Sequence, residues 1–68
     1  MNYVYVLSDE DREVLGVAIG EVGIRNIIES EFEGCEYTLE KVGSSFDCTV
    51  KTNIYRDDLI HVDRFEVK

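Results

Sequence analysis

Short apolar runs broken by polar turns occupy both ends of the chain. Residues 3–7 are β-branched, aromatic or leucine, and they stop at a polar turn over residues 8–12. A second apolar run follows over residues 14–19. Two such runs separated by a polar turn are typical of a β-hairpin. The pattern therefore predicts a hairpin with an acidic loop at the start of the chain.

The spacing of apolar residues changes after residue 20. Ile24, Ile27, Ile28 and Phe32 fall on one stripe of a helix. Gly34 follows where a left-handed glycine commonly ends a helix. The spacing predicts an amphipathic helix over residues 21–33.

Three further apolar runs predict strands over residues 35–42, 46–55 and 59–67. The turns between them are predicted at residues 43–45 and 56–58, which are rich in glycine, serine and aspartate. The expected fold is α+β, a single small domain with element order ββαβββ. Its sheet is expected to be mainly antiparallel, with one helix packed on one face. No linker divides the 68 residues, so residues 1–68 are predicted to form one domain.

The middle hairpin allows a register to be predicted. Phe46, Cys48, Val50 and Ile54 alternate on one face, and we place Val50 opposite Leu39. Cys35 then lies opposite Ile54, and Cys48 lies opposite Lys41. This separates the two cysteines by roughly 20 Å along the strands, so both are expected to be reduced.

The last strand has two competing parities. Leu59, Phe65 and Val67 share one parity, whereas Ile60 and Val62 share the other. A β-bulge near His61 would reconcile them.

The formal net charge of −8 limits the classes of partner that the chain is expected to bind. Such a charge repels nucleic acid and anionic membranes and favours basic protein surfaces. The chain has neither a long apolar span nor a basic signal segment, so a cytoplasmic protein is expected. A domain this small is marginally stable alone, which leaves a homodimer open.

The sequence offers little catalytic chemistry. His61 is the single histidine, and it lies in a predicted strand with no metal-ligand motif. We expect no metal, no cofactor and no enzymatic activity. An enzymatic alternative would rest on His61 with Asp63 or Asp58.

Acidic residues gather where a helix does not favour them. Glu29, Glu31 and Glu33 lie in the last turns of the predicted helix, where the helix dipole favours cations. Glu36 and Glu40 follow without an intervening base. The surface serves either solubility or docking to a basic partner.

The docking hypothesis joins two acidic segments into one surface. Its predicted partner-binding residues are Asp9, Glu10, Asp11, Glu29, Glu31, Glu33 and Glu36. Carboxylates spaced like phosphates would let the chain act as a nucleic-acid mimic on a basic groove. The alternative function is a structural or regulatory module that oligomerises or pairs through a sheet edge.

The residues Val4-Tyr5-Val6-Leu7, the acidic turn, and Val14-Leu15-Gly16-Val17 resemble segments of small acidic αβ proteins of bacteriophages and mobile elements. The amphipathic helix and Tyr37-Thr38-Leu39-Glu40 extend this resemblance over about forty residues. The resemblance implies a bacterial cytoplasmic setting and an inhibitor of host machinery, such as an anti-CRISPR protein. It supplies no catalytic residue.

Overall fold

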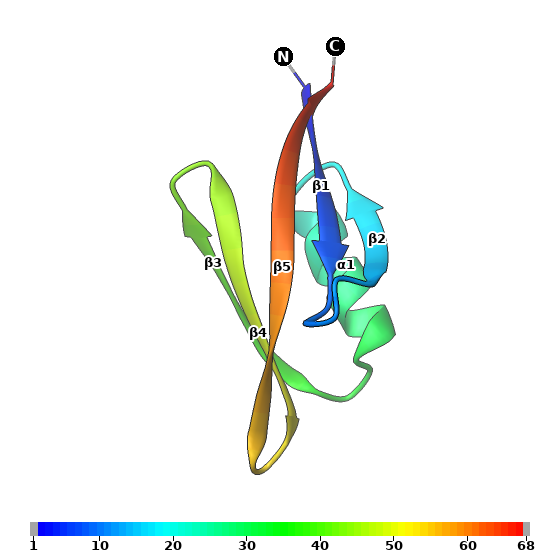
Figure 1. The fold of residues 1–68 in the computed structure, drawn as a ribbon, viewed down its shortest axis with the longest axis vertical. Coiled ribbons are helices and arrows are strands. Elements are labelled where there is room, and N and C mark those ends of the chain that lie inside the picture. The colour runs from blue at the N-terminus through cyan, green and yellow to red at the C-terminus, as the bar shows by residue number, and fades with distance from the viewer. Residues whose placement is uncertain (1, 68) are drawn as a thin grey trace.

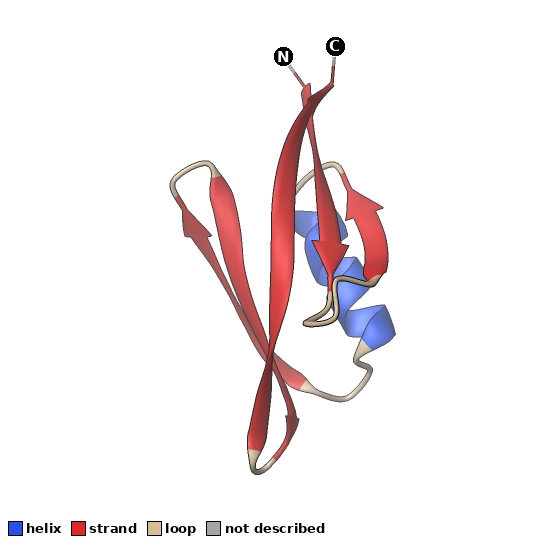
Figure 2. Ribbon diagram, viewed as in Figure 1, coloured by secondary structure: helices blue, strands red, loops and turns tan. Residues whose placement is uncertain are grey.

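The computed structural model describes residues 2–67 and has the expected order ββαβββ (Figure 1). Its elements are β1 (Asn2–Ser8), β2 (Val14–Ala18), α1 (Glu21–Glu31), β3 (Glu36–Val42), β4 (Ser45–Asn53) and β5 (Arg56–Val67). Five antiparallel strands form one sheet, and α1 is the helix that packs against it (Figure 2). The α+β prediction is confirmed.

The last strand lies at the centre of the sheet. The strand order is β2-β1-β5-β4-β3. The C-terminal half of β5 pairs with β1, from Asn2↔Val67 to Ser8↔His61, and its N-terminal half pairs with β4. The sheet therefore has two wings, β1–β2 and β3–β4, that share β5 (Figure 1).

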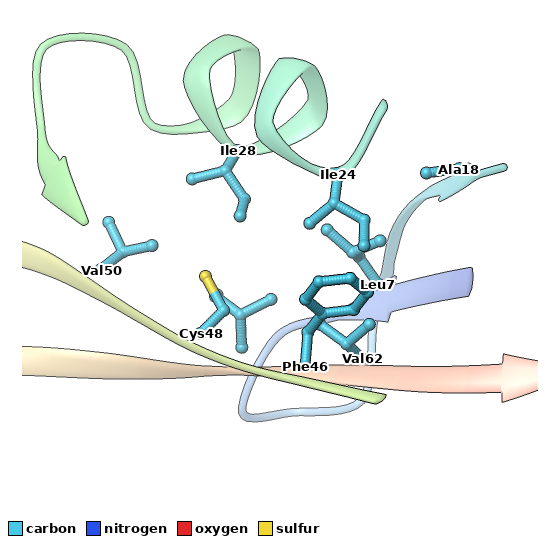
Figure 3. Close-up of a cluster of buried hydrophobic side chains, with 9 residues drawn as sticks. Leu7, Ala18, Ile24, Ile28, Phe46, Cys48, Val50 and Val62 are labelled. Carbon is cyan, nitrogen blue, oxygen red and sulfur yellow. The ribbon is translucent and has the colours of Figure 1, made fainter. Parts of the chain in front are cut away.

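The core lies between α1 and the sheet. Ile24 and Ile28 project from the helix toward Leu7, Cys48 and Val50, and all five side chains are fully buried (Figure 3). Further residues of the predicted stripe, Ile27 and Phe32, pack at the margin. Burial of each isoleucine side chain of this stripe contributes about 1.5–3 kcal/mol to the stability of the fold. The stripe therefore anchors the helix to the sheet.

Small residues let the helix approach β2 closely. A Cβ added at Gly16 would lie 3.0 Å from Cδ1 of Ile27, and one added at Gly23 would lie 3.0 Å from Cβ of Ala18. Larger side chains at these glycines would push α1 away from the sheet.

The helix ends at Glu31, two residues earlier than predicted. The backbone N–H of Cys35 donates to the carbonyl oxygen of Phe32, which closes a four-residue turn. Gly34 is the third residue of this turn and has φ of 82°, as a type II turn requires. The expected left-handed glycine is confirmed, but it lies within a separate turn after the helix rather than directly at the helix end.

The predicted register of the middle hairpin is wrong by two residues. Leu39 lies opposite Cys48, Tyr37 opposite Val50, and Lys41 opposite Phe46. The observed two-residue turn at Gly43 and Ser44 pairs Val42 with Ser45, whereas the predicted register would have placed Val42 opposite Asp47. A shift of two keeps each side chain on its predicted face.

The next turn is also misplaced in the prediction. Ile54 and Tyr55 form the turn, and Arg56, Asp57 and Asp58 already belong to β5. Asn53 makes this turn possible because its Oδ1 accepts the backbone N–H of Tyr55 at 2.7 Å. Ile54 and Tyr55 therefore form a turn despite their high β propensity, because the Asn53 side chain stabilises that turn.

The predicted bulge near His61 is not present in β5, which pairs regularly with β1. Instead, Ile60 and Val62 face the core, while Leu59, Phe65 and Val67 lie about half exposed on the other face. Register shifts occur elsewhere, between Leu7 and Ser8 and between Lys51 and Asn53. Cys35 and Cys48 are both free thiols, as expected.

Candidate acidic docking site

Three segments that are far apart in sequence enclose an acidic cleft of about 240 Å³. They are the β1–β2 loop, the end of α1, and the first residues of β5. The lining residues are Asp9, Glu10, Asp11, Leu15, Glu31, Phe32, Arg56, Asp58 and Ile60. Five carboxylates thus surround one guanidinium above an apolar floor. The cleft exists because β1 ends at Ser8, so the first residues of β5 lack a strand neighbour on that side.

Glu10 covers part of this open strand edge. Its Oε1 accepts the backbone N–H of Leu59 at 3.1 Å, and its Oε2 accepts NH2 of Arg56 at 3.0 Å. Arg56 also donates from Nε to Asp58 at 2.8 Å. The hydrogen bond to Glu10 and the charge of Asp58 raise the pKa of Arg56. Glu10 therefore holds the β1–β2 loop against β5.

Asp9 organises the loop itself. Its Oδ1 accepts the backbone N–H groups of Asp11 and Glu13, both at 2.9 Å. Arg12 has φ of 65°, in the left-handed region that residues other than glycine rarely adopt, and its guanidinium forms an ion pair with Asp63 at 3.5 Å. The loop is thus fixed by side-chain chemistry, which aims Asp11 into the cleft.

Two exposed predicted acids line the cleft without an ionic partner. Among residues 2–67, neither Asp11 nor Glu31 forms an ion pair within 4.0 Å. Both are exposed. Glu31 is the last residue of α1, where the helix dipole adds further negative potential. These two carboxylates are therefore free to meet an external cation.

Glu29 has a different role on the neighbouring helix face. It accepts the Tyr37 hydroxyl at 2.8 Å, which links α1 to β3. Arg25 lies over the same ring, 5.9 Å from its centroid, and bonds Glu21. The pKa of Arg25 is raised, first by the hydrogen bond to Tyr37 and then by that to Glu21. Glu29 thus supports helix packing.

The remaining predicted residues lie outside the cleft. Glu33 is exposed in the turn after α1. Glu36 lies on β3 beside Lys51 and Asp57, in a shallow depression of about 400 Å³. The structure therefore brings together Asp9, Glu10, Asp11 and Glu31, but not Glu29, Glu33 or Glu36.

Sequence reasoning missed Arg56 and Asp58 as parts of this site. The sequence predicts a turn over residues 56–58, although Arg56 and Asp58 lie opposite the β1–β2 loop. The pairing of Leu7 with Val62 brings these segments together. That pairing was the missing signal, because the residues are more than 45 positions apart.

Other chemistry is sparse in the described part of the chain. No group of three or more His, Cys, Asp or Glu residues within 2–67 is arranged to hold a metal ion. His61 lies in a separate depression with Asp47 and Asp63, away from the acidic cleft. Among residues 2–67, α1 is too short and too polar to cross a membrane.

Comparisons with known proteins add no relative to this picture. No protein-family model, no curated protein and no solved structure matches the chain.

Proposed function

We propose that this chain is a non-enzymatic, acidic protein-binding inhibitor whose cleft docks on the basic surface of a partner. The observation that carries the proposal is the gathering of five carboxylates around one cleft by three separate segments. Four of them, Asp9, Glu10, Asp11 and Glu31, belong to the docking surface proposed from the sequence.

The charge pattern favours docking over solubility alone. Arg56 is paired with Glu10 and Asp58 inside the cleft, while Asp11 and Glu31 remain open to solvent. A surface kept only for solubility would gain nothing from a concave arrangement above the apolar Leu15 and Phe32. A concave acidic site suits an inserted lysine or arginine side chain.

The partner class follows from this charge. Extended basic surfaces on cytoplasmic proteins commonly serve nucleic-acid binding. We therefore propose that the chain occupies such a surface on a host defence or nucleic-acid-processing protein, in a bacterial cell that carries a phage or mobile element.

The test is affinity capture from bacterial lysate with two charge-matched variants. Asp11→Asn/Glu31→Gln removes the open cleft acids. Asp47→Asn/Glu40→Gln removes the same charge from the paired strands β3 and β4. We expect the wild type and the control to retain a nucleic-acid-binding protein that high salt releases. The cleft variant should lose it.

A second measurement ties capture to inhibition. The purified partner should lose its nucleic-acid binding when wild-type protein is added, and keep it with the cleft variant. Equal behaviour of the two charge-matched variants, or capture that resists high salt, would overturn the proposal.

A further inference from the structure

β5 runs past the end of β1 and leaves part of one edge without a neighbouring strand (Figure 1). The pairing with β1 ends at Ser8↔His61, whereas β5 begins at Arg56. Residues 56–60 therefore pair with β4 on one side only. We call this stretch the open edge. It borders the acidic cleft, because Arg56 and Asp58 belong to the cleft lining.

Backbone groups of the open edge are directed away from β4. A residue in an antiparallel strand presents its N–H and its carbonyl oxygen to the same neighbour, and successive residues alternate between the two edges. The N–H of Leu59 faces the open side, because it donates to Oε1 of Glu10 at 3.1 Å. Asp57, two residues earlier, therefore presents its N–H and carbonyl oxygen to the same side. Open strand edges of this kind accept a further strand.

Glu10 occupies the position that a carbonyl oxygen of a neighbouring strand would take. Its carboxylate accepts the N–H of Leu59, as such a carbonyl does in a β-ladder. The Glu10 side chain comes from the β1–β2 loop and is 41% exposed. The open edge is thus capped by one accessible side chain, which an incoming strand can replace.

We propose that the open edge binds an extended basic segment of the partner as an added β-strand. A carbonyl oxygen of that segment would replace Glu10 as the acceptor of the Leu59 N–H. This inference rests on the proposed function, because it names the part of the basic partner that enters the cleft. At about 3.3 Å per residue, a segment of about five residues covers the open edge.

The two faces of the sheet select the side chains of the segment. Side chains of an added strand alternate between the two faces. On the cleft face they meet the carboxylates of Asp58, Asp11 and Glu31. On the other face they lie beside Leu59, which is 49% exposed. The ligand is therefore a segment with a basic residue at every second position and apolar residues between them.

Fluorescence anisotropy with a labelled peptide of five alternating lysine and valine residues tests this ligand. One control peptide has the same composition with its lysines grouped together. A second control is methylated at every backbone nitrogen, so it cannot donate hydrogen bonds to a strand edge. Both controls should bind about tenfold more weakly, because each loses several contacts at once. Equal affinity of the methylated peptide would overturn strand addition, and equal affinity of the grouped peptide would overturn the alternating pattern.

Two variants of Glu10 test whether the strand replaces its carboxylate. Glu10→Ala and Glu10→Gln remove the same charge, but only Glu10→Ala removes the acceptor of the Leu59 N–H. The alternating peptide should bind Glu10→Ala several-fold more tightly than Glu10→Gln, because it meets no competing acceptor. The same affinity for both variants would contradict a strand that displaces Glu10.

Hydrogen exchange of the wild type keeps the test independent of how the variants fold. The Asp57 amide faces the open edge, so it should exchange about tenfold more slowly when the alternating peptide is bound. Slowing confined to β3, at the outer edge of the sheet, would place the peptide there and overturn the inference.

The inference and the proposed function fail in different experiments. Capture of a salt-released partner without binding of the alternating peptide would leave the inhibitor in place and exclude strand addition. Peptide binding without such capture would support the open edge as a site for basic strands and overturn the inhibitor.

Discussion

Cys48 shows how burial changes the chemistry of a single side chain. Its side chain is fully buried between α1 and the sheet, and burial raises the pKa of its thiol from 9.0 to about 11, with a smaller opposing effect from the charge of Arg25. Thiolate is the reactive form of cysteine. Cys48 is therefore inert in the folded chain, whereas the half-buried Cys35 is more accessible.

The raised pKa of Cys48 predicts a loss of stability at alkaline pH. Below about pH 9 the thiol is neutral in both states, and its contribution is fully present. Above pH 9 the unfolded chain loses this proton while the folded chain retains it, so the free energy of unfolding falls until pH reaches about 11. The expected loss is about 2 kcal/mol.

Urea unfolding at a series of pH values isolates this effect. The difference in unfolding free energy between the wild type and Cys48→Ala should narrow by about 2 kcal/mol between roughly pH 8 and 11. Cys35→Ala should keep the steep pH dependence of the wild type. Parallel profiles for the wild type and Cys48→Ala would contradict the prediction.

At the residue scale, parity alone predicts most of the core. Ile24 and Ile28 follow from helical spacing, and Phe46, Cys48 and Val50 from alternation along β4. Ile54 is the exception, because the side chain of Asn53 favours a turn where apolar alternation favours a strand. This turn depends on one hydrogen bond from the Tyr55 backbone to the Asn53 side chain. The pattern of apolar residues does not reveal that hydrogen bond.

At the scale of elements, Glu10 links the first loop to the last strand. Its carboxylate accepts hydrogen bonds from the Arg56 guanidinium and from the backbone N–H of Leu59. Both donors lie on the edge of β5 that β1 does not cover. We predict that Glu10→Ala frees this edge and speeds hydrogen exchange of the Leu59 amide several-fold. Exchange of the Val50 amide, in the core, should change only with global stability.

Asp11→Asn is the control for this prediction. Asp11 is adjacent in the loop, but its side chain forms no ion pair among residues 2–67. The Asp11→Asn variant should therefore leave the hydrogen-exchange rate of the Leu59 amide unchanged. Equal exchange in Glu10→Ala and the wild type would show that the edge is held by other contacts.

Element order was predictable, but strand order was not. Each hairpin depends on a local turn, so periodicity and turn residues predict it. The position of β5 between β1 and β4 depends on pairs such as Leu7 with Val62, which are 55 residues apart and leave no local pattern. The cleft depends on this pairing, so the sequence indicated its acids but not their arrangement.

At the scale of the whole molecule, docking and stability place opposite demands on the end of α1. Three acidic residues occur at or near this end, and the last turn contains no base. We predict that Glu31→Lys stabilises the fold by about 0.5 kcal/mol, because a cation suits the helix C-terminus. The same change should abolish salt-sensitive partner capture.

Chemical denaturation and affinity capture of the same sample test this trade-off. Ser30→Lys, one residue earlier on α1, adds a base to the same turn but lies outside the cleft lining. It should give a similar stabilisation and weaken capture less. If both variants bind equally well, the helix-end acid serves no partner.

The central position of β5 also has a consequence for how the chain reaches its native state during synthesis. The β1–β2 and β3–β4 hairpins each form from neighbouring residues, but neither pairs directly with the other. The strand that joins them leaves the ribosome after both. The core side chains of the two hairpins and α1, such as Leu7 and Cys48, therefore remain exposed to water until residues 56–67 have been synthesised. Because those twelve residues complete both wings at once, the sheet is expected to form in a single cooperative step once residues 56–67 are present.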